Sequence, residues 1–181
     1  MNINQKEYTI NHLHYIIRSA NEEDAHCLSE VRVQIDGETE NMDREAGEAY
    51  IDEAGFKQII HDDTESDCNL FLVAEVNGRI VGFSRCEGSK LNRSAHKVEF
   101  GVCVLKEYWG FGIGTNFLIE SIQWADSNGI KKITLKVLET NEKAINLYKK
   151  LGFEVEGTLK KDKKLSDGIF YNTILMGRIC E

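Results

Sequence analysis

Apolar and polar residues alternate over several short segments of the chain, a pattern typical of β-strands that bury one face. Two apolar segments flank Asn77-Gly78, the dipeptide that most strongly favours a tight turn between antiparallel strands. A further alternating segment, 97–105, runs directly into a glycine-rich stretch. The pattern predicts strands at 15–18, 69–76, 79–86, 97–105, 130–138, 153–159 and 169–179.

Other segments carry apolar residues at every third or fourth position, which is the spacing of one face of a helix. Leu28, Val31 and Ile35 follow this spacing, and Gly152 ends the last such segment as a typical C-terminal stop. The pattern predicts helices at 22–35, 44–61, 115–127 and 142–151, with an irregular stretch at 37–43. Because strands and helices alternate in the second half of the chain, the predicted fold class is α/β (α+β), not a helical bundle.

The composition is typical of one globular domain, with 181 residues of which 41% are hydrophobic and 29% charged. No apolar run approaches the ~20 residues that cross a bilayer, and residues 1–10 lack the regions of a signal peptide. The five cysteines are scattered and form no CxxC pair, so we expect reduced thiols in a cytoplasmic protein without disulfides or a metal site. A membrane partner is not expected.

The charge is unevenly distributed along the chain. The net charge of −8 argues against non-specific binding of nucleic acid. Residues 19–67 hold 16 Asp and Glu against 3 Lys and Arg, whereas residues 131–164 hold 10 Lys and 5 acidic residues. Two interpretations stay open: solvated helix faces, or separate binding regions for a cationic and an anionic ligand.

Gly110, Gly112 and Gly114 alternate with other residues between a predicted strand and a predicted helix. Glycines at alternate positions allow successive backbone N–H groups to point into one concavity, and the following helix adds its free N-terminal amides. A diphosphate fits such a site. No Gly-Lys-Ser/Thr follows, which excludes a Walker A loop, and the spacing differs from the dinucleotide-binding fingerprint.

Two motifs in the second half resemble those of the GNAT superfamily of N-acetyltransferases. Val102-Cys103-Val104 with the segment 109–114, WGFGIG, is similar to its coenzyme A-binding motif, and the segment 141–153, NEKAINLYKKLGF, is similar to its second motif. A looser resemblance extends over 15–176. Trp109 stands where the family usually has Gln or Arg, and Asn172 where related chains often carry Asp.

The resemblance implies a mixed, mostly antiparallel central sheet of about seven strands flanked by four helices. This sheet would be splayed between the strands at 97–105 and 130–138. It also implies a single N-acetyltransferase domain over residues 1–181, with an N-terminal extension at 1–14 and a core at 15–179.

The resemblance further implies acetyl-CoA as co-substrate and assigns residues to bind it. The main chain of the strand before the glycine turn would pair with the pantetheine arm like an added strand. The turn would hold the diphosphate, and the second motif would complete the site. The implied coenzyme-binding residues are Val102, Cys103, Val104, Trp109, Gly110, Phe111, Gly112, Ile113, Gly114, Thr115, Asn141, Ala144 and Tyr148.

Acyl transfer to an amine requires a proton donor for the leaving thiolate and an acceptor for the proton of the amine. The family implies Tyr148 as the donor, although its spacing also fits a core tyrosine. Glu99 lies mid-strand, where a carboxylate is costly unless it is paired or acts as a base. We therefore consider Glu99 as the base, directly or through water, as an edge-facing glutamate, or as an ion-pair partner of Arg85 or Lys97. His96 is the second candidate base.

The sequence says less about the amine that would receive the acetyl group. The region between the first two helices contains an acidic cluster that suits a cationic amine, made of Asp36, Glu38, Glu40, Asp43 and Glu45. A small-molecule amine and a peptide amine both remain open as substrates, and the final hairpin is a candidate homodimer interface. Two other function classes are an inactive acyl-CoA sensor or scaffold, and a nucleotide-binding protein, for which no base-recognition element is found.

Overall fold

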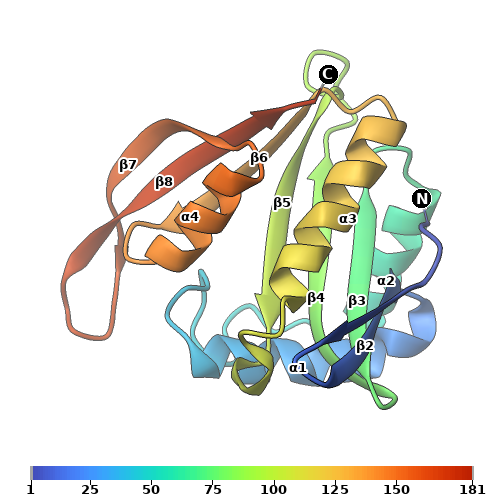
Figure 1. The fold of residues 1–181 in the computed structure, drawn as a ribbon. Helices are drawn as coiled ribbons and strands as arrows, with labels where there is room; N and C mark the ends of the chain where they lie inside the picture. Colours follow the sequence, from blue (N-terminus) through green and yellow to red (C-terminus); the bar gives the residue numbers. More distant parts are fainter. Residues whose placement is uncertain (1, 181) are drawn as a thin grey trace.

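The computed structural model describes residues 2–180 and contains one eight-stranded sheet with strand order β1-β2-β3-β4-β5-β6-β8-β7 (Figure 1). Every neighbouring pair is antiparallel except β5 and β6, which are parallel. The strands are β1 (Lys6–Ile10), β2 (Leu13–Ser19), β3 (Leu70–Val76), β4 (Arg79–Gly88), β5 (Lys97–Val104), β6 (Lys132–Leu138), β7 (Glu154–Lys164) and β8 (Phe170–Ile179).

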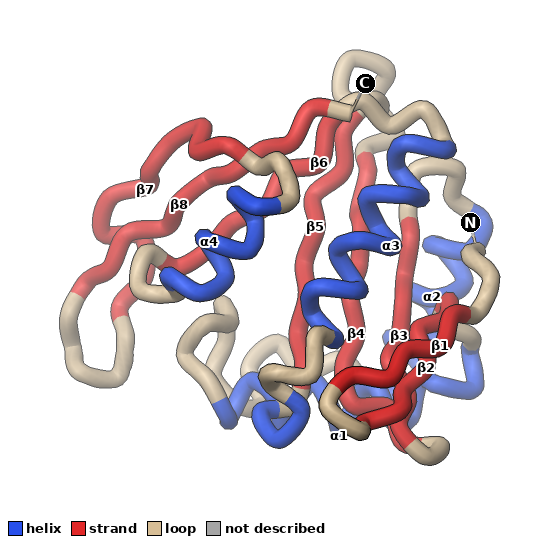
Figure 2. Tube along the Cα trace, viewed as in Figure 1, coloured by secondary structure: helices blue, strands red, loops and turns tan. Residues whose placement is uncertain are grey.

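Four α-helices cover the sheet, with α3 and α4 on one side and α1 and α2 on the other (Figures 1 and 2). Short 3-10 turns at Glu22–Asp24 and Lys106–Tyr108 precede α1 and α3. The predicted fold class, a mixed and mostly antiparallel sheet with four helices, is confirmed. The helices are α1 (Ala25–Glu38), α2 (Glu53–Glu65), α3 (Ile113–Ser127) and α4 (Glu142–Lys150).

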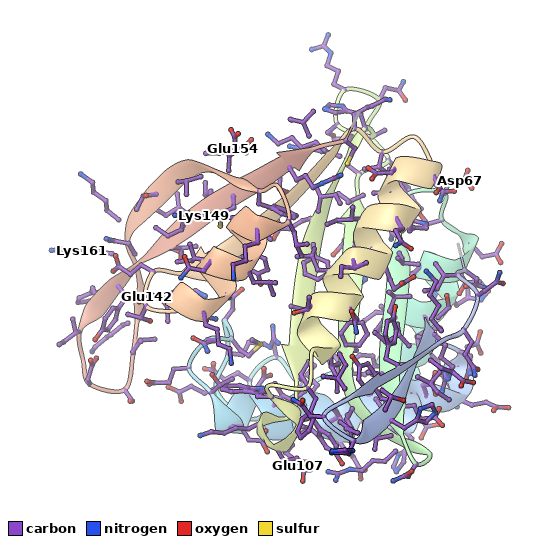
Figure 3. All side chains as sticks on the ribbon, viewed as in Figure 1. Asp67, Glu107, Glu142, Lys149, Glu154 and Lys161 are labelled. Atoms are coloured by element: carbon purple, nitrogen blue, oxygen red, sulfur yellow. The ribbon has the colours of Figure 1, made fainter. Side chains whose placement is uncertain are left out.

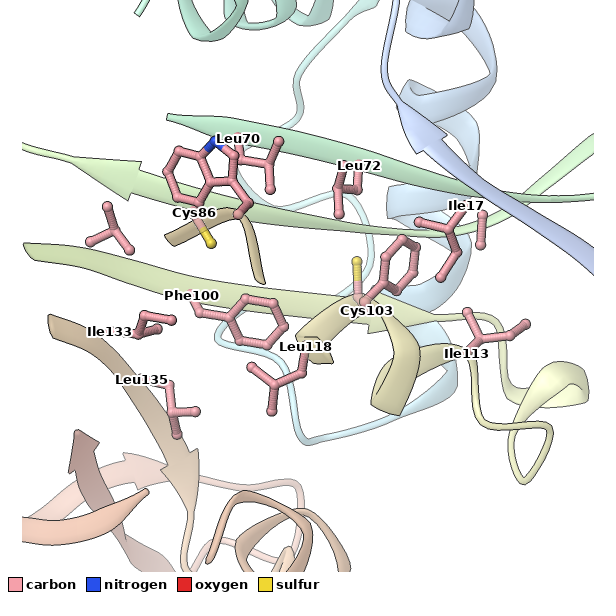
Figure 4. Close-up of a cluster of buried hydrophobic side chains, with 14 of the residues drawn as sticks. Ile17, Leu70, Leu72, Cys86, Phe100, Cys103, Ile113, Leu118, Ile133 and Leu135 are labelled. Carbon is pink, nitrogen blue, oxygen red and sulfur yellow. The ribbon is translucent and has the colours of Figure 1, made fainter. Parts of the chain in front are cut away.

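Two hydrophobic clusters hold these layers together. The larger one joins the sheet to α3 and α4, and Figure 4 shows part of it, with Leu118 of α3, Phe100 of β5 and Ile133 of β6. The smaller one lies between the sheet and α1–α2, where Phe56 packs against Phe71 and Phe83 with ring centroids 6.4 and 6.3 Å away. The sheet therefore has a buried layer on each side.

The sheet has one strand more than the seven expected. Residues 6–10, predicted as part of an N-terminal extension, form β1 and pair with β2 from Lys6↔Ile17 to Ile10↔Leu13. The connecting residues Asn11 and His12 both have positive φ, 50° and 66°, as a two-residue hairpin turn of this type requires.

The second helix begins later than predicted. It was expected at 44–61, but α2 spans Glu53–Glu65. Asp52 caps it, since its carboxylate accepts a 2.8 Å hydrogen bond from the Gly55 amide. Arg44, predicted to be helical, instead forms two hydrogen bonds of 3.0 and 3.1 Å with the buried carboxylate of Asp36. This pair, which joins residues eight positions apart, holds the preceding loop against α1.

The sheet opens between β5 and β6. These strands pair only where Lys97–Glu99 meets Lys132–Thr134, and beyond this point they diverge. In Figure 1, β6, β7, β8 and α4 swing away from β5 towards the glycine-rich end of the strand. This splay was expected between the same two strands, and we call the space between them the gap.

Candidate active site

Every second residue of β5 directs its backbone N–H and C=O groups towards the gap. Leu105 donates its N–H to Val81 of β4 at 2.9 Å, whereas the Val98 carbonyl accepts a 3.2 Å bond from Thr134 of β6. Successive residues of a strand direct their N–H and C=O groups to opposite sides, and β4–β5 pairing shows no register shift. The backbone groups of even-numbered residues therefore point away from β4, and those of Val102 and Val104 point into the gap.

Cys103 lies between these two residues, so its backbone groups face β4. Its thiol is buried, and this burial, with a smaller contribution from the Asp36 carboxylate, raises the pKa of Cys103 to about 12. Of the three residues predicted to pair with a pantetheine arm, two therefore offer their main chain to a ligand in the gap. Phe100, which the sequence did not single out, belongs to the same set of gap-facing residues.

Trp109 reaches back to this edge of β5. Its indole Nε1 donates a 2.8 Å hydrogen bond to the Val104 carbonyl, while 44% of the residue remains exposed. The residue thus connects the glycine turn with the last residue of the strand.

The glycine turn has the backbone conformation that its sequence predicts. Gly110 and Gly112 have positive φ values of 88° and 76°, and Gly112 is the N-cap of α3. A Cβ at Gly110 or Gly114 would meet no heavy atom within 4 Å, so space is open beside the first amides of the helix. Because free N–H groups and the positive end of a helix dipole meet at this open space, the turn fits a diphosphate.

The side chains of the turn contribute differently from its backbone. Ile113 is 1% exposed and belongs to the larger hydrophobic cluster, so only its main chain can meet a ligand. Phe111 and Thr115 are half-buried. The sequence motif therefore combines side chains that pack in the core with backbone groups that face the open space beside α3.

Across the gap, α4 presents the second predicted motif. Asn141 caps this helix, because its side-chain oxygen accepts a 3.3 Å hydrogen bond from the Ala144 amide. Glu142 lies in the first turn and Lys149 in the last (Figure 3), which complements the helix dipole. The capping role of Asn141 leaves its side-chain NH₂ group available for a ligand.

Tyr148 points from α4 into the same hydrophobic cluster against which Val102, Val104 and Ala144 pack. It is 9% exposed, and its ring lies 6.0 Å from that of Phe153. Burial raises the pKa of Tyr148 to about 12. The phenol therefore keeps its proton throughout the neutral range, as a proton donor must.

Glu99 is not on the apolar face of its strand. Its side chain is 53% exposed and forms an ion pair with Lys136 of β6, with O–N distances of 3.1 and 3.2 Å. Neither predicted partner is used: Arg85 instead binds Asp63 and Glu87, and among the described residues no ion pair joins Lys97 to Glu99. The pair bridges β5 and β6 next to Glu99↔Thr134, the last pair before the gap.

A cavity of about 490 Å³ adjoins this point. It lies where the charged face of β4 and β5 meets β6, and its lining includes Arg85, Glu87, Lys97, Glu99, Gly101 and Thr134. The lining carries charges of both signs. The sequence missed Lys136 because nothing in its own strand indicates which residue of β5 it would meet.

His96, the second candidate base, is exposed at the start of β5. Its carbonyl accepts hydrogen bonds of 2.8 and 3.2 Å from the amides of Lys131 and Lys132. Its backbone thus extends the contact between β5 and β6, at the end of the strand opposite to the glycine turn.

Three of the five acidic residues singled out in the sequence line a second cavity, of about 460 Å³. Asp36, Glu38 and Glu40 lie on one side of it, and Leu138 and Thr140 on the other. The Glu38 carboxylate accepts a 2.7 Å hydrogen bond from the Lys106 amide, and the Glu40 carboxylate accepts one of 2.8 Å from the Ser166 amide. These bonds tie the end of α1 to the glycine-rich end of β5 and to the β7–β8 loop.

The other two acidic residues lie outside this lining. Asp43 forms an ion pair with Lys163 of β7, and Glu45 accepts no bond at its side chain among residues 2–180. Over the same residues, no helix is long and apolar enough to cross a bilayer, and His, Cys, Asp and Glu side chains form no group suited to a metal ion.

Comparison with known proteins identifies the family. The model of the acetyltransferase (GNAT) family matches residues 14–153, most of the chain and both motifs. The chain therefore belongs to this family, a class of acetyl-CoA-dependent acyltransferases. The resemblance inferred from the two motifs is confirmed.

Individual relatives show how far the similarity extends. The L-amino acid N-acetyltransferase AaaT of Escherichia coli is 34% identical over 109 residues, 60% of this chain and 67% of that protein. The spermidine N(1)-acetyltransferase of E. coli is 32% identical over 118 residues, 65% of this chain and only 60% of that protein. A solved GNAT-family acetyltransferase from Streptococcus pneumoniae is 27% identical with a TM-score of 0.88, covering 92% of this chain and 99% of that one.

Proposed function

We propose that this protein is an N-acetyltransferase that moves the acetyl group of acetyl-CoA directly to a primary amine, with residues 1–181 acting as one domain. The observation that carries the proposal is the backbone of Val102 and Val104, which faces the gap beside the glycine turn and is not paired with β6. The pantetheine arm contains two amides and can pair with such an edge as an added strand. The cradle formed by the turn and the start of α3 suits the diphosphate.

In the proposed reaction, a bond forms between the amine nitrogen and the thioester carbon, and the carbon–sulfur bond breaks. The amine loses a proton and the thiolate of coenzyme A gains one. We assign Tyr148 as the proton donor because it lies in the cluster that lines the gap and retains its proton. A backbone N–H of β5 near Val104 is the proposed donor to the oxyanion.

For the proton of the amine, we assign Glu99, directly or through a water molecule. Glu99 is the last residue of β5 that pairs with β6, so its carboxylate lies where the gap begins. His96 lies further along the strand, away from the gap, and remains the second candidate. The adjoining cavity gives an amine access to the carboxylate.

For the acceptor, we propose a small amine that carries more than one positive charge. Asp36, Glu38 and Glu40 line one cavity, and among them only Asp36 is neutralised by a cation, Arg44. A net negative lining attracts a polycation. The relative that acetylates spermidine makes polyamines the first compounds to test. A peptide amine is the second acceptor class.

The test is thiol release from acetyl-CoA with polyamines, aminoglycosides, amino acids and peptides that have free N-termini. We expect turnover with polyamines that falls as salt concentration rises, because screening weakens the attraction. Equal rates with neutral amino acids and no salt dependence would contradict the acceptor class. Coenzyme A binding without turnover on any amine would favour the acyl-CoA sensor or scaffold, and an absence of coenzyme binding would refute the main proposal.

A further inference from the structure

The side chain of Trp109 occupies one of the acceptors on the free edge of β5. The Val104 carbonyl faces the gap, and the indole Nε1 donates to it at 2.8 Å. An added strand pairs with alternate residues of an edge, so a ligand arm in the gap would use the backbone groups of Val102 and Val104. Among residues 2–180, no side chain donates to the Val102 carbonyl. One of the two acceptors is therefore already occupied by the protein itself.

This hydrogen bond can be exchanged at low cost. Trp109 is 44% exposed, and a hydrogen bond between groups in contact with water contributes only about 0.5–1.5 kcal/mol net. Gly110 follows directly, with φ of 88° and no heavy atom within 4 Å of the position of a Cβ. The indole is thus in contact with solvent, and no side chain on the next residue restricts it.

We propose that Trp109 is a latch on the coenzyme-binding edge. Its indole holds the Val104 carbonyl in the free protein, and an amide N–H of the pantetheine arm displaces it when acyl-CoA binds. This inference rests on the proposed function. It predicts that Trp109 lowers the affinity for ligands that carry the arm, and leaves unchanged the affinity for ligands that reach only the glycine turn.

The test compares two ligands and two proteins by calorimetry. Coenzyme A carries the arm, whereas adenosine 3′-phosphate 5′-diphosphate keeps the diphosphate and lacks the arm; we call it the arm-free nucleotide. Trp109→Phe keeps an aromatic ring and removes the competing N–H. We expect this variant to bind coenzyme A about two- to tenfold more tightly than the wild type, the range that corresponds to one net hydrogen bond. Binding of the arm-free nucleotide should be the same in both proteins.

Fluorescence supplies a second readout, because displacement of the indole from the Val104 carbonyl changes its surroundings. Trp124, the other tryptophan, is 4% exposed in the core, so a ligand in the gap should mainly alter the emission of Trp109. We expect coenzyme A to change the wild-type emission more than the arm-free nucleotide does, and the Trp109→Phe protein to show no such difference.

The other outcomes separate the two proposals. Equal affinities of both proteins for coenzyme A, with no change in emission, would overturn the latch and leave the proposed function intact. Weaker binding of both ligands to Trp109→Phe would show that Trp109 supports the turn, which also overturns the latch. If neither protein binds coenzyme A, the proposed function itself is wrong.

Discussion

The phenol of Tyr8 in β1 donates a 2.6 Å hydrogen bond to Glu120 of α3, although 112 positions separate the two residues. The Lys6 ammonium lies 2.7 Å from the same carboxylate, whose side chain is 4% exposed. The ring of Tyr8 stacks on that of Tyr15, and the Tyr15 hydroxyl accepts a 2.6 Å bond from Asn116. The first hairpin thereby holds the helix whose N-terminus forms the glycine turn.

Tyr8→Phe should lower the free energy of unfolding by about 1–2 kcal/mol, because it removes a donor from a buried carboxylate. Burial, together with Glu120, raises the pKa of Tyr8 above its ordinary value, so the phenol remains the donor at neutral pH. Urea unfolding measures the change. The control is Tyr50→Phe at a 60% exposed position, with an expected change below about 0.5 kcal/mol. Equal stability of the two variants would show that the hairpin does not hold α3.

Gly112→Ala should lower the stability of the folded protein more than Gly110→Ala does, although both glycines have positive φ. A Cβ at Gly112 would lie 2.7 Å from Cδ1 of Ile10, whereas at Gly110 it would meet open space. Backbone strain alone costs about 1–2 kcal/mol at either position, and the clash at Gly112 adds a smaller amount, because Cδ1 is the end of a side chain that can shift. Thermal unfolding of both variants measures the difference.

A double variant tests the cause of this difference. Ile10→Ala removes the clashing atom. The loss of stability caused by Ile10→Ala should therefore be smaller in the Gly112→Ala protein than in the wild type. Additive losses of stability would mean that contact with β1 does not explain the need for glycine at this position.

The elements from Leu70 onwards follow from the sequence because their signals are local. Asn77-Gly78 forms the turn between β3 and β4, with φ values of 50° and 80°, and Gly152, with φ of 87°, follows the last helix. Both motifs that resemble the GNAT family lie in this part of the chain, where alternation and helical spacing agree with the observed elements, except that β7 continues to Lys164 and was predicted only to residue 159. In this part of the chain, the structure that each segment favours locally is the one that it adopts in the fold.

The missed features depend on contacts between residues that are distant in sequence. β1 is short and largely polar, and its place follows from Tyr8 meeting Glu120. The start of α2 was misplaced because Arg44 pairs with Asp36 and the loop remains irregular. Whether Glu99 would be buried depends on how much of β5 the first two helices cover, which no pattern within the strand reveals. Tertiary contacts override local preference at these positions.

Tyr148→Phe should reduce kcat about 100-fold or more and change KM little, since a positioned proton donor contributes about 10²–10⁴ in rate. The ring and its packing against Phe153 are retained. Steady-state kinetics with the best amine of the panel measures the effect. An unchanged kcat would identify Tyr148 as a residue of the core only.

The same residue should make stability dependent on pH in the alkaline range. Burial raises the pKa of Tyr148 from its ordinary value of 10.0 to about 12 in the folded protein. Both states are protonated below pH 10, and above it the unfolded chain loses this proton first, so stability falls as pH rises. The stability difference between wild type and Tyr148→Phe should therefore decrease by about 2 kcal/mol between pH 9 and 12. A constant difference in denaturant unfolding would contradict the burial of the phenol.

Glu99→Gln should lower kcat by about 100-fold if the carboxylate accepts the proton of the amine. Lys136→Met removes the ion-pair partner and keeps the carboxylate, so kcat should fall much less. Glu87→Gln is the matched control, since Glu87 lines the same cavity and pairs with Arg85. Small and equal effects of the Glu99 and Lys136 variants would reduce the pair to a surface ion pair, worth at most about 1 kcal/mol.

The short contact between β5 and β6 has a mechanical consequence. Hydrogen bonds have preferred directions, and strand pairing between β5 and β6 is confined to Lys97–Glu99 and Lys132–Thr134. Beyond these residues, the two portions of the sheet share a hydrophobic cluster to which Leu118 of α3 and Leu135 of β6 belong, and such packing is not directional. The angle between the two portions of the sheet is therefore set by the volumes of core side chains, and a substitution far from any ligand can widen or narrow the opening.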